Sequence, residues 1–358
     1  MKVLILGCGS IGNHLANASR RMDWEVSMCD VDPNAIKRTK DLIYPSRYGG
    51  WDDKIKFIEF PTSEISKFDM VIVGTPPDTH IDLAIQALKI KPKCILIEKP
   101  LCGLDFSNID QLINLANEEN VKLFIGYDHS LSKAIAELKR LLDNNNFGKV
   151  ETIDVDFREE WSGIFAAHPW LDGPSDSYLG YSKRGGGAAG EHSHGIHLWQ
   201  YLSKISGQGT VTSVNCTMKK FKDSNVDYDK LSIMNFKTDK GLLGKCVQDV
   251  ITKPSKKSAR VQFDKGFLKV SFTPKLDIIS YSIENSNDIK ELRFEKDRPS
   301  DFILELTHID KCIKGDFDIE NSPISINHGL DVMKIIKTAH ISNDSNSIEF
   351  IKPISDFI

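Results

Sequence analysis

The chain has 358 residues, of which 40% are hydrophobic and 27% charged, as expected for a globular protein long enough to form two domains. Its net charge of −4 gives no electrostatic basis for binding nucleic acid or an anionic membrane. No apolar run reaches the ~20 residues that span a bilayer. Seven cysteines without CxxC spacing indicate reduced thiols and a cytoplasmic protein.

The first motif of the chain follows an N-terminal apolar run. Residues 2–6 read as a buried strand, residues 7–12 have the sequence GCGSIG, and residues 13–18 read as the start of a helix. Strand, glycine turn and helix in this order predict a dinucleotide-binding βαβ unit. The helix N-terminus would offer N–H groups to the pyrophosphate. The predicted cofactor contacts in this turn are Gly7, Gly9, Ser10, Ile11 and Gly12.

Cofactor choice is indicated at the end of the next strand. Residues 25–29 form this predicted strand, and Asp30 follows it. A carboxylate at this position binds the adenosine ribose hydroxyls and repels a 2′-phosphate, which favours NAD over NADP. Lys37 and Arg38 lie a few residues downstream, and their positive charges keep NADP as a possible alternative cofactor.

The rest of the N-terminal half alternates strands with helices. Strands are predicted at 70–74, 94–97 and 122–125, with helices at 81–88 and 108–119. This alternation predicts a doubly wound parallel sheet, in which ligands bind beyond the carboxyl ends of the strands.

Four motifs in order resemble those of the Gfo/Idh/MocA oxidoreductases: GCGSIG, GTPPDTH at 74–80, EKPL at 98–101 and GYDHS at 126–130. The resemblance implies an α/β Rossmann domain, here residues 1–125, and an α+β domain with a large, mainly antiparallel open sheet, residues 126–358. It places Lys99 beside the nicotinamide and implies a homo-oligomer, a dimer or tetramer. Further cofactor contacts are predicted at the carboxyl ends of the strands of this sheet: Thr75, Pro76, His80, Glu98 and Lys99.

The C-terminal half reads as strands joined by hairpin turns, with helices at 195–205, 301–314 and 327–342. Residues 162–190 form a long irregular segment rich in Gly, Pro, Trp and Tyr, which is typical of a functional loop. It resembles a loop of family members linked to surface-glycan and nonulosonic-acid sugars. Ser130 and Leu131 replace the arginine-containing pattern that the family usually has after Gly126. The candidate substrate contacts are Asp128, Trp170, Tyr178, Tyr181 and Arg184.

The catalytic candidates follow that loop. By resemblance, Glu191 is the acidic residue and His194 the catalytic histidine of the family's Asp/Glu-x-x-His motif. If the stretch is helical, Glu191, His194 and His197 share one face. His192 and His197 are interpreted as surface residues. No metal is expected, because HExxH is absent and His192 should point away from His194 on a helix.

The sequence therefore predicts an NAD(P)-dependent oxidoreductase that acts on a secondary alcohol or ketone of a sugar, polyol or sugar nucleotide. A non-catalytic NAD(H) sensor of the same fold and a reductase of a non-sugar substrate are the alternatives. Lys99 and His194 together favour an enzyme, since a sensor needs neither a proton acceptor nor a polarising cation.

Overall fold

The computed structural model describes residues 1–61, 67–144, 147–166, 168–284 and 288–357. The chain forms two compact units. The first contains Met1–Asp128 and Arg298–Asn327, and the second contains His129–Asp297 and His328–Ile358. Within the described residues, no helix is both long and apolar enough to cross a membrane.

A six-stranded parallel sheet forms the centre of the first unit. Its order, β3-β2-β1-β4-β5-β6, is that of the Rossmann fold and confirms the predicted fold class. The central strands read as continuous apolar runs such as MVIV and CILI because helices cover both faces of such a sheet. The strands are β1 (Lys2–Leu6), β2 (Glu25–Cys29), β3 (Lys56–Phe57), β4 (Met70–Val73), β5 (Cys94–Ile97) and β6 (Lys122–Ile125).

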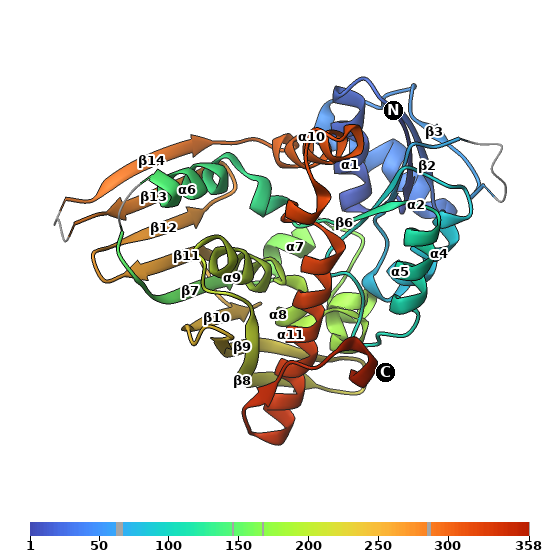
Figure 1. The fold of residues 1–358 in the computed structure, drawn as a ribbon. Coiled ribbons are helices and arrows are strands. Elements are labelled where there is room, and N and C mark those ends of the chain that lie inside the picture. The colour runs from blue at the N-terminus through green and yellow to red at the C-terminus, as the bar shows by residue number, and fades with distance from the viewer. Residues whose placement is uncertain (62–66, 145–146, 167, 285–287, 358) are drawn as a thin grey trace. The chain divides into compact units, whose positions relative to one another are not determined.

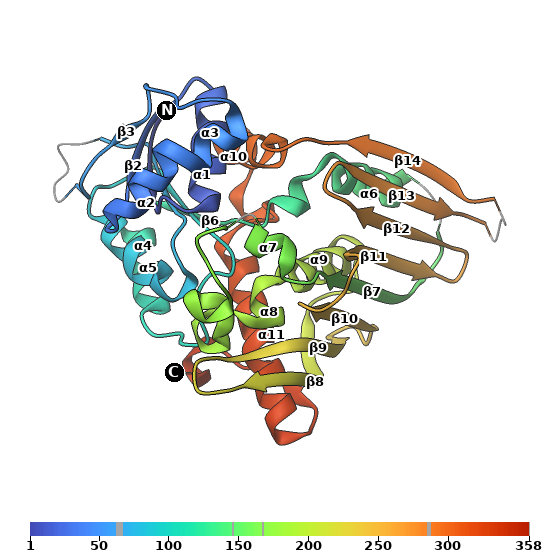
Figure 2. The ribbon, with the colours of Figure 1, turned by 180° about the vertical axis from the view of Figure 1, so that it is seen from behind.

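Helices from two distant parts of the sequence pack on this sheet. The N-terminal part supplies α1 (Ser10–Arg21), α2 (Pro33–Arg38), α3 (Tyr44–Tyr48), α4 (His80–Leu88) and α5 (Ile109–Glu118). Residues 298–327 return to the same unit and place α10 (Ser300–Lys314) beside α1, as both views show (Figures 1 and 2). The Phe302 ring stacks on His14 at 5.2 Å between centroids. The sequence analysis predicted domains of residues 1–125 and 126–358, and it did not predict that residues 298–327 belong to the first unit.

The second unit is built on a nine-stranded sheet of order β14-β13-β12-β11-β7-β10-β9-β8-β15. Its neighbouring strands are antiparallel except for β7 and β10, so the prediction of a mainly antiparallel sheet is confirmed. The strands are β7 (Val150–Arg158), β8 (Val211–Lys222), β9 (Asp227–Thr238), β10 (Leu243–Asp249), β11 (Lys256–Phe263), β12 (Gly266–Phe272), β13 (Leu276–Ser282), β14 (Lys290–Glu295) and β15 (Glu349–Phe350).

One face of this sheet packs against helices. They are α6 (Lys133–Asn144), α7 (Ser162–Ala166), α8 (Gly187–Glu191), α9 (His194–Ile205) and α11 (Ile326–Ser345), of which α9 contacts β7 and β10. Trp199 on α9 is completely buried, and its indole N–H donates to the carbonyl of Ile153 at 2.8 Å. A Cβ at Gly244 would lie 2.9 Å from the same ring, so the indole rests directly on β10. This contact fixes the helix that begins at His194.

Candidate functional site

The glycine turn has the geometry that a dinucleotide requires. Gly7 has φ +104°, and a Cβ there would lie 2.6 Å from the carbonyl oxygen of Gly74. A Cβ at Gly12 would lie 2.1 Å from the carbonyl oxygen of Gly7. Gly9, at the N-cap of α1, has no atom within 4 Å of a Cβ position, among the described residues. Two glycines therefore permit tight packing, and the third leaves room for a phosphate beside free helical N–H groups.

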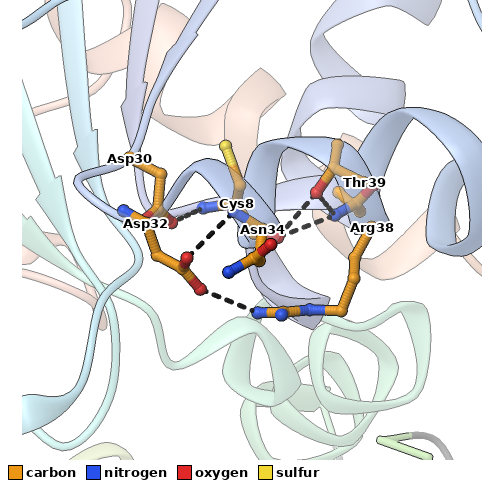
Figure 3. A network of polar contacts seen from close by, with 7 residues as sticks. Cys8, Asp30, Asp32, Asn34, Arg38 and Thr39 are labelled. Carbon is orange, nitrogen blue, oxygen red and sulfur yellow. Dashed lines mark hydrogen bonds and ion pairs between the residues drawn. The ribbon is translucent and has the colours of Figure 1, made fainter. Parts of the chain in front are cut away.

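Polar contacts hold the turn on the side of Asp30 (Figure 3). The Asp30 carboxylate accepts from the backbone N–H of Cys8 at 2.7 Å and from that of Asp32 at 2.9 Å. Asp32 in turn accepts from the N–H of Asn34 and pairs with Arg38 at 3.2 Å. Asp30 is thus fixed between the glycine turn and the start of α2, where a carboxylate can receive ribose hydroxyls.

The opposite side of the turn is held by Thr39. Its hydroxyl donates to the carbonyl of Cys8 at 2.6 Å and accepts from the side-chain amide of Asn13 at 3.0 Å. Cys8 itself is 1% exposed, and burial raises the pKa of its thiol to about 12. Cys8 therefore fills space as a neutral side chain, and the turn is rigid before any ligand arrives.

His80 joins two loops at the carboxyl ends of neighbouring strands. One ring nitrogen lies 2.7 Å from the carbonyl oxygen of Thr75, after β4, and the other lies 3.0 Å from that of Pro100, after β5. The ring is completely buried, and burial lowers the pKa of His80. Its side chain therefore positions Thr75, Pro76 and the loop of Lys99.

Beneath that loop lies a cluster of buried carboxyl groups, which sequence reasoning missed as a cluster. Glu98 is 6% exposed, packs against Gly126 and accepts from the backbone N–H of Lys99 at 3.3 Å. Burial raises the pKa of Glu98 to about 8, and the neighbouring Asp128 contributes to the same shift. Glu305, from α10, is completely buried, and neither of its carboxyl oxygens has a hydrogen-bond partner within the described residues.

The electrostatics of this cluster follow from its composition. Burial raises the pKa of Glu305 well above its ordinary value, with Glu98 as the next cause. Carboxyl groups that share a dry interior cannot all ionise, so the cluster retains protons near neutral pH. Glu305 could not be found from sequence because it is some 200 residues from Glu98 and lies in an ordinary amphipathic helix.

In the second unit, the predicted motif is divided between two helices. Helix α8 ends at Glu191 and α9 begins at His194, so the expectation of one helical face shared by Glu191, His194 and His197 is wrong. The chain turns at His192, whose carbonyl accepts from the side-chain amide of Gln248. The interpretation of His192 and His197 as surface residues is also wrong, because they are 4% and 2% exposed.

His194 is half-buried among aromatic rings. Its ring lies 4.3 Å from that of His129 and 6.4 Å from that of Phe157, between centroids. His129 was not among the predicted site residues, although it lies inside the GYDHS motif. Its position next to Asp128 is the signal that could have identified it.

The segment 162–190 is a folded part of the second unit, apart from residue 167, which lies outside the described residues. Tyr178 donates to the Glu191 carboxylate at 3.2 Å, which brings these two predicted residues together. Tyr181 donates to the carbonyl of Asn225, and the Arg184 guanidinium lies 5.7 Å from the centre of the Tyr181 ring. Trp170 is half-buried beside His168, near the N-terminal end of the segment.

Asp229 anchors the glycine run that precedes Glu191. Its carboxylate accepts from the backbone N–H of Ala189 at 2.8 Å and from the hydroxyl of Ser182 at 2.9 Å. A Cβ at Gly187, where φ is +75°, would lie 2.1 Å from the same carboxylate. Asp229 is completely buried and therefore fixes the start of α8. No motif marked it, since it is the third residue of an otherwise ordinary strand, β9.

Comparison with protein families assigns both halves of the chain. Residues 1–127 match the profile described as an oxidoreductase family with an NAD-binding Rossmann fold, and residues 135–269 match the GFO/IDH/MocA C-terminal domain. The chain therefore belongs to the Gfo/Idh/MocA family of oxidoreductases, which confirms the family that its motifs indicated.

Curated relatives match over part of their length. The chain is 26% identical over 161 residues to a myo-inositol 2-dehydrogenase of Thermotoga maritima and 24% identical over 235 residues to a glucose-6-phosphate 3-dehydrogenase of Bacillus subtilis. These alignments cover 44% and 64% of this chain, and 46% and 61% of the two relatives. The chain is thus aligned with less than two thirds of either relative.

Among solved structures, the WlbA dehydrogenase of Bordetella pertussis in complex with NADH and UDP-GlcNAcA has a TM-score of 0.71 at 18% identity. The match covers 98% of this chain and 99% of that one. At this identity the likeness shows that the two proteins share a fold.

Proposed function

We propose that this protein is an NAD-dependent dehydrogenase or reductase of a secondary alcohol or ketone in a sugar, polyol or sugar nucleotide. The observation that carries the proposal is the preorganised glycine turn with Asp30, within a chain whose two halves both match one oxidoreductase family. Oxidation of such an alcohol releases a proton from oxygen and a hydride from carbon, and NAD is the hydride acceptor.

Residues of the protein would accept the proton and stabilise the charge on the substrate oxygen. His194 accepts it from the substrate hydroxyl, because an imidazole exchanges protons near neutral pH. Lys99 donates a hydrogen bond to the same oxygen and stabilises the negative charge that develops there. Glu191 accepts a hydrogen bond from Tyr178, and its carboxylate would orient the imidazole of His194. In the reductive direction the same groups return the proton.

The substrate class is supported by the relatives' names, which refer to myo-inositol and glucose 6-phosphate, and by the UDP-GlcNAcA bound to WlbA. Each contains a cyclic polyol or a sugar ring. The segment 162–190 would determine which one is accepted, with aromatic rings to stack on the substrate and Arg184 to pair with a phosphate or carboxylate. Arg184 would supply the positive charge that the family usually has after Gly126, where this chain has Ser130 and Leu131 instead of the arginine-containing pattern.

The remaining parts of the proposal concern cofactor choice and setting. NAD would be preferred to NADP because Asp30 would accept hydrogen bonds from the adenosine ribose hydroxyls and repel a 2′-phosphate, and because Arg38 is paired with Asp32. The seven buried cysteine thiols suit a cytoplasmic protein. We also propose that the enzyme is a homo-oligomer and that it needs no metal ion for activity.

A substrate panel distinguishes the enzyme from a sensor. The wild-type protein is incubated with NAD and each of several inositols, hexose phosphates and UDP-linked sugars or uronic acids, and NADH absorbance is followed. An enzyme forms NADH with at least one of these compounds. Tight NAD binding without turnover on any member of the panel, in either direction, would favour a sensor and contradict the proposal.

A further inference from the structure

One buried carboxylate holds both ends of the loop that carries Arg184. The Asp229 carboxylate accepts from the Ser182 hydroxyl at 2.9 Å and from the backbone N–H of Ala189 at 2.8 Å. The Ser182 hydroxyl oxygen in turn accepts from the backbone N–H of Asp229 at 3.2 Å. Residues 182–189 thus form a loop closed by Asp229, and Arg184 lies within this closed loop.

Glycines bring the closed loop into direct contact with its neighbours. A Cβ at Gly187 would lie 2.1 Å from the Asp229 carboxylate. A Cβ at Gly186 would lie 2.1 Å from the carbonyl oxygen of Tyr178. The loop therefore packs on the carboxylate at one position and on the backbone of residue 178 at the next, which leaves its path little freedom.

Asp229 is a costly residue for the interior. It is completely buried, and burial raises the pKa of its carboxyl group, with His340 on α11 as the next influence, which opposes the rise. Its hydrogen-bond donors are a hydroxyl and a backbone N–H, neither of which is a cation. A carboxyl group in such a place costs free energy that an apolar side chain would not, whereas its directed contacts favour one conformation of the loop.

The two contacts of Asp229 lie next to groups to which the proposed function gives a role. Ser182 is two residues before Arg184, in the 3-10 turn Ser182–Arg184. Ala189 is two residues before Glu191, in the same short helix, α8. A shift at either contact therefore moves the guanidinium or the carboxylate.

We propose that Asp229 is a positioning residue, which acts through the closed loop to fix Arg184 and Glu191 together. Asp229 does not touch the substrate. The assignment rests on the proposed function, in which Arg184 binds an anionic group of the substrate and Glu191 orients His194. Placement of this kind matters because a misplacement of about 1 Å can cost on the order of 10²-fold in rate.

Hydrogen–deuterium exchange tests the closed loop without any need for activity. Exchange is followed by mass spectrometry in peptides that contain Ala189, for the wild type and the Asp229→Ala and Ser182→Ala variants. Asp229→Ala removes the acceptor of the Ala189 N–H, so this amide should exchange about 10-fold faster or more. Ser182→Ala removes one contact of the closed loop and serves as the test should Asp229→Ala fold poorly.

Steady-state kinetics on the substrate that the panel identifies tests the placement. In Asp229→Ala, kcat/KM should fall by about 10- to 100-fold with a raised KM, because the site is no longer preorganised. A variant that is only partly folded lowers kcat and leaves KM unchanged, so KM separates the two causes. NAD affinity should stay within about twofold of wild type, since the loop belongs to the second unit.

Asparagine is the conservative replacement. Its amide oxygen can accept from the Ala189 N–H, and its amide nitrogen can donate to the Ser182 hydroxyl. Asp229→Asn should therefore keep kcat/KM within about threefold of wild type, with slow exchange at Ala189.

Asp239, exposed at the other end of β9, provides the matched control. It also accepts from a backbone N–H, that of Thr210 at 2.9 Å, and it contacts Gly209, where φ is +79°. Asp239→Ala should loosen its own turn and leave KM and the exchange of residues 182–189 unchanged.

Four outcomes would overturn the assignment. Unchanged exchange at Ala189 in both alanine variants would show that Asp229 does not hold the loop. Faster exchange with a wild-type KM, or an equal rise of KM in Asp239→Ala, would make Asp229 a residue of stability alone. A loss in Asp229→Asn as large as in Asp229→Ala would exclude a role through these hydrogen bonds. If the wild type converts no compound of the panel, the proposed function fails and the positioning role with it, even where exchange shows the closed loop.

Discussion

Replacing Glu98 by Gln should stabilise the folded protein at alkaline pH and flatten its pH dependence. Burial and Asp128 raise the pKa of Glu98 to about 8 from an ordinary 4.5. Between these values the folded state keeps a proton that the unfolded chain has released. The free energy of unfolding therefore falls as pH rises, and the contribution that is fully present below pH 4.5 is lost as pH passes 8.

The magnitude follows from proton linkage. One proton retained by the folded state changes the free energy of unfolding by about 1.4 kcal/mol per pH unit, which is about 4 kcal/mol across three units. Glutamine keeps the volume and can accept from the Lys99 N–H, but it does not titrate.

Urea unfolding at pH 5, 6, 7 and 8 measures this difference. The stability of Glu98→Gln relative to wild type should rise steadily over the series. Glu137→Gln is the control: this half-buried glutamate pairs with Arg140, and hydrogen bonding from Arg140 lowers its pKa, so it is ionised throughout the range. Parallel curves for Glu98→Gln and wild type would refute the reasoning.

Three further predictions concern Asp30 in the first unit and Asp229 and Arg184 in the second. Asp30→Ala should weaken NAD binding and narrow the preference over NADP, as measured by titration with both; tighter NADP binding by the wild type would contradict this. Asp229→Ala leaves the Ala189 N–H unpaired and should lower the free energy of unfolding by about 2–4 kcal/mol in urea, whereas an unchanged midpoint would argue against the anchor. Arg184→Ala should raise the KM for an anionic substrate strongly with no change in NAD affinity, and wild-type kinetics would exclude this role.

The sequence predicted the parts of the structure that depend on local order. The run MVIV is buried on both faces and had to be a central parallel strand, and GCGSIG has the glycines that its close contacts require. These patterns identify the Rossmann sheet and the cofactor turn because each lies within a short stretch of chain.

What the sequence did not predict depends on contacts between distant residues. Glu305 reaches the carboxyl cluster only because residues 298–327 return to the first unit. Arg47 reaches Ser10 from a helix without a recognisable motif. The break between α8 and α9 also follows tertiary contacts, since Gln248 binds the His192 carbonyl and Asp229 holds the start of α8. Helical spacing alone could not reveal it.

The central claim is that Lys99 and His194 serve one hydride-transfer reaction. Its most direct test is the NADH formed by Lys99→Ala and His194→Ala on the substrate that the panel identifies, with NAD affinity measured in parallel and Lys89→Ala and His308→Gln as controls. Positioned proton transfer is worth on the order of 10²–10⁴ in rate, so each site variant should lose turnover by about that factor while binding NAD nearly as wild type. Wild-type turnover in both site variants would contradict the account.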